Sequence, residues 1–167
     1  RTEPGWAYGF PELSAEHREK IKNGKRIAVP GCYASGFVSL VYPLVKGGIL
    51  PKDYPVSCFA LSGYSGAGKK TIAVYESEDR PTELASGRVY ALTQQHKHLK
   101  EMKAITGIDR VPLFSPVIDD YYSGMVMSVP VYTDMLQKAK TPEEIHKMFS
   151  EFYAGEIVLG ELVNPIK

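Results

Sequence analysis

The chain has 167 residues, 44% hydrophobic and 23% charged, a balance that suits one globular domain with its own core and excludes a disordered or fibrous chain. Twenty Lys and Arg against nineteen Asp and Glu give a formal net charge of +1, without the basic excess of a nucleic-acid-binding protein. No apolar run reaches the roughly 18 to 20 residues that cross a membrane, and no N-terminal signal pattern is present. We therefore expect a soluble cytoplasmic protein with neither a membrane nor a nucleic acid as partner.

The first half of the sequence alternates short helices and strands. An N-capping residue at Ser14, mostly polar residues after it and a terminating Gly24 are typical of a capped, exposed helix. After Pro30 and Gly31 the apolar residues recur at helical spacing, so Cys32 is expected at a strand-to-helix turn. In chain order we predict a helix over 14–23, a strand over 25–29, a helix from the turn to residue 46, a strand over 56–61 and an irregular glycine loop over 62–70.

The second half continues with isolated elements. Thr141, Pro142 and Glu144 form a capping box with proline at the first helical position. We predict strands over 88–93, 111–117, 125–132 and 157–163, a helix over 99–106 and a helix that starts at 142. Because strands and helices do not alternate strictly, the pattern predicts an α+β fold with a mixed, largely antiparallel sheet covered by helices.

The two cysteines differ in their surroundings. A helix N-terminus stabilises a thiolate, which is the nucleophilic form of cysteine, so the position of Cys32 suits an activated nucleophile. A small buried thiol is the alternative at that position. Cys58 lies in an apolar strand beside Phe59 and is expected in the core. We read both as thiols rather than as a disulfide.

Four histidines could serve a cysteine nucleophile as proton carriers. His17 and His146 lie on polar helices and are expected at the surface. His96 and His98 would share one face of an extended backbone, because side chains alternate there. That pair suits acid–base chemistry or two metal ligands; a metal would need further ligands, with Cys32 or Glu101 the only candidates. We favour proton transfer and predict no metal site.

The segment 62–70 contains three glycines, whose backbone amides could approach an anion closely. It is not a Walker A motif, because Lys70 stands where that motif has a hydroxyl residue. A plain flexible turn is the alternative, with Lys69 and Lys70 as solvated charges.

Four segments stand in a fixed order along the chain: Trp6–Leu13 (WAYGFPEL), Pro30–Tyr33 (PGCY), Ser62–Gly68 (SGYSGAG) and the His-x-His-x-x-Glu pattern of His96, His98 and Glu101. In this order they resemble one family. The chain is similar, over residues 6–132, to the catalytic and dimerisation domain of the N-acetyl-gamma-glutamyl-phosphate reductase family, relatives of aspartate semialdehyde dehydrogenase.

The resemblance implies a mechanism. Cys32 would attack an acyl phosphate to form a thioester, which a hydride from NADPH would reduce to an aldehyde, and His96 would accept the thiol proton and later protonate the departing oxygen. His98 and Glu101 would orient the site, with Tyr90 and Lys97 in the substrate pocket. The glycine loop, through Gly63, Ser65, Gly66 and Gly68, would contact the nicotinamide end of NADP(H) or the substrate phosphate.

The resemblance also bears on domains and partners. The family has a Rossmann domain that binds NADP, and no Gly-x-Gly-x-x-Gly fingerprint follows a strand here. Because the chain starts at Arg1 and stops directly after an apolar run, we take residues 1–167 as one catalytic and dimerisation domain excised from a longer protein and nearly inactive alone. The implied partners are a small-molecule acyl phosphate and further copies of the chain, as a dimer or tetramer.

Two features depart from the usual family pattern. Lys100 replaces a proline, and the segment Tyr121–Met125 (YYSGM) stands where an arginine–glycine pair is common, which removes a natural anion ligand. Lys97, Arg88 and Lys69 are candidates to replace it.

Two other functions remain open. A Cys/His acyltransferase or hydrolase would use the same nucleophile without a cofactor, and a noncatalytic dimerisation module would use only the strands.

Overall fold

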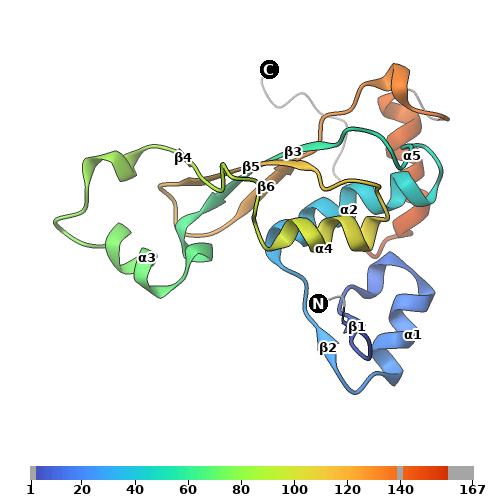
Figure 1. The fold of residues 1–167 in the computed structure, drawn as a ribbon, viewed down its shortest axis with the longest axis horizontal. Helices are drawn as coiled ribbons and strands as arrows, with labels where there is room; N and C mark the ends of the chain where they lie inside the picture. The colour runs from blue at the N-terminus through green and yellow to red at the C-terminus, as the bar shows by residue number, and fades with distance from the viewer. Residues whose placement is uncertain (1–2, 139–140, 158–167) are drawn as a thin grey trace.

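The computed structural model describes residues 3–138 and 141–157. Within these ranges the chain forms five α-helices and six strands, which Figure 1 traces from the N-terminus to the C-terminus. The helices are α1 (Ala15–Asn23), α2 (Cys32–Lys46), α3 (Lys69–Tyr75), α4 (His98–Thr106) and α5 (Pro142–Tyr153). The strands are β1 (Ala7–Tyr8), β2 (Ile27–Ala28), β3 (Ser57–Gly63), β4 (Arg88–Val89), β5 (Leu113–Asp119) and β6 (Met125–Ser128).

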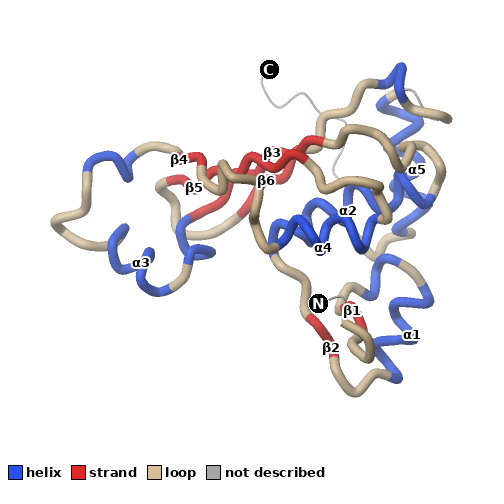
Figure 2. Tube along the Cα trace, viewed as in Figure 1, coloured by secondary structure: helices blue, strands red, loops and turns tan. Residues whose placement is uncertain are grey.

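The main sheet has four strands in the order β4-β5-β3-β6. Its central pair, β3 and β5, is parallel, with Ser57 opposite Leu113 and Gly63 opposite Asp119. Both outer pairs, β3 with β6 and β4 with β5, are antiparallel. A separate two-stranded parallel sheet joins β1 to β2 near the N-terminus (Figure 2). This arrangement confirms the predicted α+β fold with a mixed sheet: two of the three strand pairs in the main sheet are antiparallel, while its longest pair is parallel.

One face of the main sheet is covered by α2 and α4 (Figure 1). Phe37 and Val41 of α2 and Met102 of α4 are completely buried, as the helical spacing of the apolar residues predicts. In β3, Cys58 and Ala60 point into this core because side chains alternate along a strand. Burial of each large side chain stabilises the fold by roughly 1.5 to 3 kcal/mol, so this layer holds the turn that carries Cys32.

The opposite face of the sheet is open in the part of the chain that the structure describes. Phe59, Leu113 and Val126 lie on three neighbouring strands and are 43%, 66% and 60% exposed. The strand register places these three side chains on one face, since Phe59 lies opposite Ser115 and Leu61 lies opposite Val126. An apolar sheet face of this kind is the usual mark of an interaction surface.

Helix boundaries follow the sequence closely. The Ser14 side chain caps α1 by accepting the His17 amide, and the capping box of α5 forms as predicted between Thr141 and Glu144. The hydroxyl of Tyr153, at the end of α5, donates to the carbonyl of Ser39 and fastens α5 to α2.

Two predicted segments differ from the structure. The glycine loop is shorter than expected, because β3 runs to Gly63 and α3 starts at Lys69 after a single 3-10 turn. The predicted strand over 88–93 ends at Val89, because Ala91 and Gln94 have left-handed backbone conformations with φ of 54° and 55°.

The strand predicted over 125–132 ends at Ser128. The one predicted over 157–163 lies outside the described residues except for Ile157, which is in a bend.

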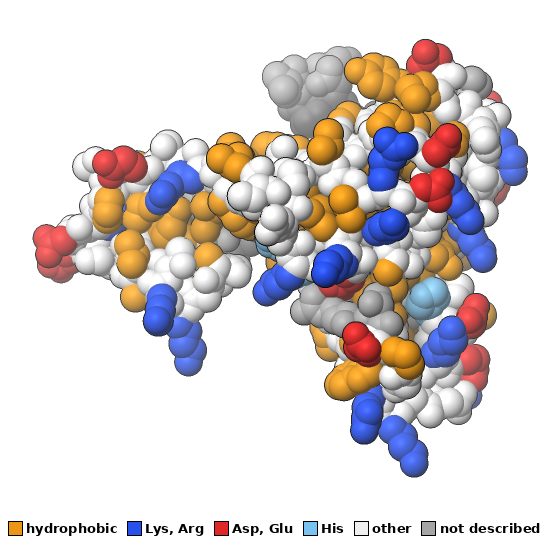
Figure 3. Space-filling model, in the orientation of Figure 1, with side chains coloured by type: hydrophobic (Ala, Val, Ile, Leu, Met, Phe, Trp, Pro, Cys, Tyr) orange, Lys and Arg blue, Asp and Glu red, His pale blue; other side chains and the backbone are white. Residues whose placement is uncertain are grey.

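Among the described helices, none is long and apolar enough to span a membrane. On the face shown in Figure 3, basic and acidic side chains are interspersed rather than gathered by sign. This pattern agrees with the near-zero net charge.

Candidate active site

The turn between β2 and α2 brings Cys32 to the edge of a cleft. Gly31 is the N-cap of α2 and Cys32 is the first helical residue, with an exposed thiol. The amide N–H of Gly31 donates to Oε1 of Glu101 over 3.1 Å. A Cβ at Gly31 would collide with the imidazole of His98, so the turn needs glycine here for close approach. The first-turn amides of α2 have no intrahelical partners.

Helix α4 holds the turn from behind. His98 and Glu101 lie one helical turn apart on α4 and are only 4% and 5% exposed. Oε1 of Glu101 also accepts the hydroxyl proton of Tyr8 over 3.0 Å. Glu101 therefore joins β1, the Gly31 turn and α4 through one carboxylate. Tyr8 is a residue that sequence reasoning missed as a site residue, although it belongs to the segment Trp6–Leu13 on which the family resemblance partly depends.

His96 lies beside His98, but not on the extended backbone that the sequence predicts. His96 is in the turn before α4 and His98 is the first residue of that helix, yet their ring centroids are 4.7 Å apart. The amide N–H of His98 donates to Nδ1 of His96 over 3.2 Å. A neutral ring that accepts at Nδ1 carries its proton on Nε2, so this contact favours one tautomer.

Burial and a nearby charge affect the protonation of His96. Loss of water contact lowers the pKa of its imidazole below the ordinary value, and the ammonium group of Lys97 lowers it further. His96 is therefore favoured as a neutral group near pH 7. A neutral imidazole can accept a proton from a neighbouring group, so His96 suits proton transfer.

A chain of three hydroxyl groups lines the cleft, with Tyr33 of the first turn of α2 in its middle. The hydroxyl of Tyr90 donates to that of Tyr33 over 2.6 Å, and the hydroxyl of Tyr33 is 2.7 Å from Oγ of Ser62. Burial, and then its hydrogen bond to Tyr33, raises the pKa of Tyr90 far above its ordinary value, so it stays protonated. Sequence reasoning missed Tyr33 and Ser62, although each belongs to a segment that it had singled out.

The glycine loop over residues 62–70 forms another part of the cleft wall. Gly63, Ser65 and Gly66 line the cleft, whereas Gly68 does not and instead caps α3. The amides of Gly63 and Ser65 donate to backbone carbonyls of the β5–β6 connection at 3.0 and 2.9 Å, so these two cannot cradle an anion as the sequence had suggested. A Cβ at Gly63 would collide with the backbone at Tyr121 and Tyr122, which explains the glycine.

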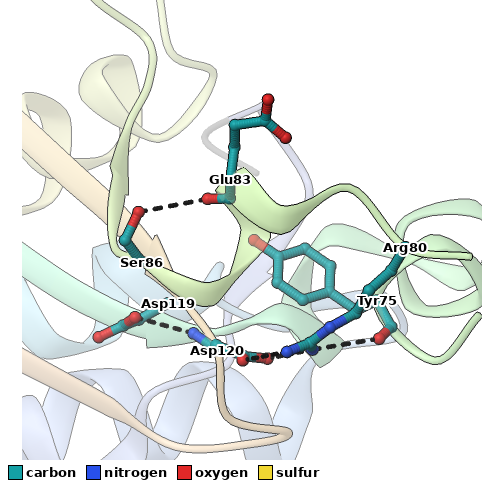
Figure 4. Close-up of polar contacts among 6 residues, drawn as sticks. All are labelled: Tyr75, Arg80, Glu83, Ser86, Asp119 and Asp120. Carbon is teal, nitrogen blue, oxygen red and sulfur yellow. Dashed lines mark hydrogen bonds and ion pairs between the residues drawn. The ribbon is translucent and has the colours of Figure 1, made fainter. Parts of the chain in front are cut away.

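An ion pair fastens the chain that follows the glycine segment. Figure 4 shows the guanidinium of Arg80 against the carboxylate of Asp120, with both contacts 2.7 Å long. The ring of Tyr75, drawn beside them, stacks on Tyr64 with centroids 4.5 Å apart. The ion pair holds the pKa of Asp120 below its ordinary value, chiefly through the hydrogen bond from Arg80. The ring stack ties α3 to the glycine loop, and the ion pair ties the chain after α3 to the end of β5.

The cleft has a volume of about 780 Å³. It brings together most of the predicted site residues, namely Cys32, Tyr90, His96, Lys97, His98, Gly63, Ser65 and Gly66. Glu101 does not line it and acts from behind through Gly31. Of the three cations considered as anion ligands, Lys97 lines the cleft, whereas Lys69 and Arg88 do not.

The other predicted residues behave differently. Cys58 is buried in β3, and burial raises the pKa of its thiol to about 12. Within the described ranges, no group of three or more His, Cys, Asp or Glu side chains is arranged to hold a metal ion.

Comparisons with known proteins give three findings. A family model described as the semialdehyde dehydrogenase dimerisation domain matches residues 32–162. Proteins named N-acetyl-gamma-glutamyl-phosphate reductase are similar in sequence: the one from Sinorhizobium medicae is 41% identical and the one from Allorhizobium ampelinum 43% identical, each over 95% of this chain. The alignment covers 52% of each relative, so the chain spans about half the length of the curated relatives it matches.

Solved structures share the fold. Aspartate semialdehyde dehydrogenase from Francisella tularensis superposes with a TM-score of 0.63 at 15% identity, over 90% of this chain and 53% of that one. Aspartate semialdehyde dehydrogenase II from Vibrio cholerae gives 0.60 at 16% identity, over 90% and 50% of the two chains.

Proposed function

The chain belongs to the semialdehyde dehydrogenase dimerisation-domain family, and on this premise we propose that it is the part of an NADPH-dependent reductase that carries the nucleophile. The proposed reaction converts N-acetyl-gamma-glutamyl phosphate to N-acetylglutamate 5-semialdehyde and phosphate, as the names of its 41–43% identical relatives suggest. The observation that carries the proposal is one cleft that contains an exposed cysteine at a helix N-terminus and an imidazole favoured in its neutral form.

Cys32 supplies the covalent step. Its sulfur would bond to the acyl carbon, the bond from that carbon to the phosphate oxygen would break, and a thioester would remain on Cys32. When bound, NADP(H) supplies the hydride that reduces this thioester carbon. Cleavage of the carbon–sulfur bond then releases the aldehyde and returns the thiolate.

His96 would manage the proton. The thiol proton passes to Nε2 and from there to the departing phosphate oxygen, which balances the first step. Acceptance at Nε2 needs the tautomer with its proton on Nδ1, in which the contact from the His98 amide is lost. The imidazolium so formed would donate from Nε2 and return to that same tautomer.

The remaining site residues would bind or orient. Lys97 is the cation in the cleft that could meet the phosphate or carboxylate of the substrate. His98 and Glu101 would fix the Cys32 turn, one by ring packing on Gly31 and the other by accepting its amide. Tyr90 would line the substrate pocket as a neutral hydroxyl.

One part of the cleft wall leaves room for a cofactor. A Cβ at Gly66 would meet nothing within 4 Å, so this wall of the cleft has open space beside it. Gly63, Ser65 and Gly66 would therefore hold the nicotinamide end. We propose that the dinucleotide-binding domain lies in the part of the longer protein that this chain does not span, and that residues 1–167 alone turn over poorly.

The open sheet face supports a homo-oligomer. We propose that Phe59, Leu113 and Val126 pack against a second copy of the chain, since a dimer would bury side chains that are 43–66% exposed. In sedimentation, Val126→Asp in the full-length protein should shift the species toward the single protomer. Val74→Asp, an equally apolar but separate site on α3 that is 47% exposed, is the matched control. An unchanged mass for both variants would remove this face as the interface.

The full-length protein assayed in reverse tests the activity. With N-acetylglutamate semialdehyde, phosphate and NADP, phosphate-dependent NADPH formation is expected, and it should disappear in Cys32→Ser. Cys58→Ser changes the buried thiol and is the control for substitution of a cysteine as such. Hydrolysis of an acyl substrate without NADP would instead favour a cofactor-free Cys/His enzyme.

A further inference from the structure

The ring of Tyr33 packs among the aromatic side chains around the cleft. Tyr33 follows Cys32 in α2 and is buried. Its ring centroid lies 5.8 Å from that of His96 and 5.9 Å from that of His98, with interplanar angles of 78° and 60°. The ring of Phe114 lies 5.1 Å from that of Tyr33, centroid to centroid, and 5.3 Å from that of His96. Such ring contacts fix the relative placement of rings.

The hydroxyl of Tyr33 is fixed as well. It accepts the proton of Tyr90 and therefore has its own proton for Ser62, whose hydroxyl donates to the carbonyl of Val117 over 3.4 Å. Because the last acceptor is a carbonyl, all three hydroxyls point their protons the same way, from Tyr90 toward β5. Tyr33 is thus held at its ring and at its tip.

We propose that Tyr33 is a positioning residue for His96: its ring is the wall against which the imidazole rests, and the Tyr90–Tyr33–Ser62 hydroxyl chain holds that wall in place. The functional part of this proposal rests on the proposed function, in which His96 transfers the proton. Tyr33 itself neither gives nor takes a proton in the reaction.

The groups around the imidazole explain why a ring is needed. Tyr33, Tyr90, His98 and Phe114 surround His96, and the charged group that acts on it is the ammonium of Lys97. Removal of the Tyr33 ring admits water to one face of the imidazole and lets it turn. Phenylalanine keeps the wall and loses only the hydroxyl chain, whereas leucine loses both.

Histidine titration by NMR tests the contact without reference to activity. In the full-length protein with ¹³C-labelled histidine, the His96 signal, assigned from His96→Gln, should titrate below the ordinary histidine value in the wild type and in Tyr33→Phe. In Tyr33→Leu its midpoint should rise toward the ordinary value. Tyr153→Leu, which removes a buried tyrosine far from the cleft, should leave it unchanged. If Tyr33→Leu does not fold, Tyr33→Met removes the ring with an adaptable side chain.

Kinetics of the same variants test the consequence for proton transfer. Tyr33→Leu should lower kcat about 100-fold, the order of loss expected for a misplaced catalytic group, while KM changes less than about threefold. Tyr33→Phe and Ser62→Ala should each lower kcat about fivefold, and the double variant should lose no more than the worse single variant, because both break one chain.

The outcomes separate the two proposals. An unchanged His96 midpoint in both Tyr33→Leu and Tyr33→Met would overturn the positioning role, as would a loss confined to KM, which would make Tyr33 a substrate contact. A wild-type protein without reductase activity would overturn the proposed function, while the titration would still decide whether Tyr33 positions His96.

Discussion

The two cysteines lie in regions with opposite surroundings, one exposed at a helix N-terminus and one buried in a strand. Cys32 follows a Pro–Gly turn at the N-terminus of α2, is exposed, and lines a cleft with polar side chains. Cys58 is the second residue of β3, where alternation points it into the apolar core, and burial raises its pKa to about 12. The same side chain is therefore available for reaction in one region and inert in the other.

The difference shows how little of the site depends on residue type alone. In β3, neighbouring strands and α2 remove water from the thiol and offer it no charge partner. At the turn, a glycine without a Cβ lets His98 approach and lets Glu101 hold the backbone. The backbone conformation around each cysteine, rather than the cysteine, decides its chemistry.

The largest expected effect is in alkylation. At pH 7 a thiol with a pKa near 12 is about one part in 10⁵ thiolate, and only the thiolate reacts. Iodoacetamide should therefore modify Cys32 at least about a thousandfold faster than Cys58. Peptide mapping by mass spectrometry gives the ratio, and the unfolded protein, where both should react within about threefold, is the control. Similar alkylation rates of Cys32 and Cys58 in the folded protein would contradict this prediction.

The imidazole of His96 shares a cleft with Cys32, whereas Cys58 lies outside that cleft. His96→Gln in the full-length protein should lower kcat by about 10² to 10⁴, the range for loss of an acid–base group, with a smaller change in KM. His17→Gln, on the exposed helix α1, is the matched control. Wild-type turnover in His96→Gln would assign the proton transfer to another residue.

Substitution of Glu101 tests whether its carboxylate stabilises the Gly31–Cys32 turn. Glu101→Ala leaves the buried donors of Gly31 and Tyr8 without their acceptor, so the free energy of unfolding should fall by about 1 to 3 kcal/mol per donor. Alkylation of Cys32 should change with it, while that of Cys58 stays slow. Glu101→Gln keeps an accepting oxygen and should retain most of both properties. Denaturant unfolding measures the free energy of unfolding, and mass spectrometry measures the alkylation rate of Cys32. If Glu101→Ala changes neither, Glu101 does not hold the turn.

The smallest expected effect is in the pH dependence of stability. Burial, more than the nearby Lys20 and Lys97, lowers the pKa of His17 and of His96 below 6.5 in the folded chain. The unfolded chain therefore binds protons first as the pH falls through 6.5, and the free energy of unfolding should decrease there. This window lies above the range in which carboxylates titrate. Urea unfolding at pH 7.5 and 5.5 should show the loss in the wild type and a smaller loss in His96→Gln; an increase at the lower pH would contradict it.

Local rules in the sequence predicted much of the fold. The caps at Ser14 and Thr141, the helical spacing that follows Gly31 and the alternation around Cys58 each act within a few residues. The strand predicted over 88–93 was wrong beyond Val89, because the left-handed residues there serve a distant contact. The side chain of Gln94 exchanges two 2.8 Å hydrogen bonds with the backbone of Phe114.

The candidate site was only partly predictable for the same reason. Cys32 and His96 stand out by residue type and motif. The pairing of Tyr8 with Glu101 spans 93 residues and that of Tyr33 with Tyr90 spans 57, and no spacing rule within the sequence connects either pair. Gly68 looked equivalent to Gly63 and Gly66 but lies outside the cleft lining, because α3 starts directly after it.

Trapping of the thioester tests the central claim most directly. The full-length protein, mixed with N-acetyl-gamma-glutamyl phosphate in the absence of NADPH, should release one phosphate per active site and gain an acyl group that peptide mapping finds on Cys32. Hydroxylamine should remove that group, and Cys32→Ser should acquire none. An acyl group found on another residue, or steady turnover by Cys32→Ser once NADPH is added, would contradict the account.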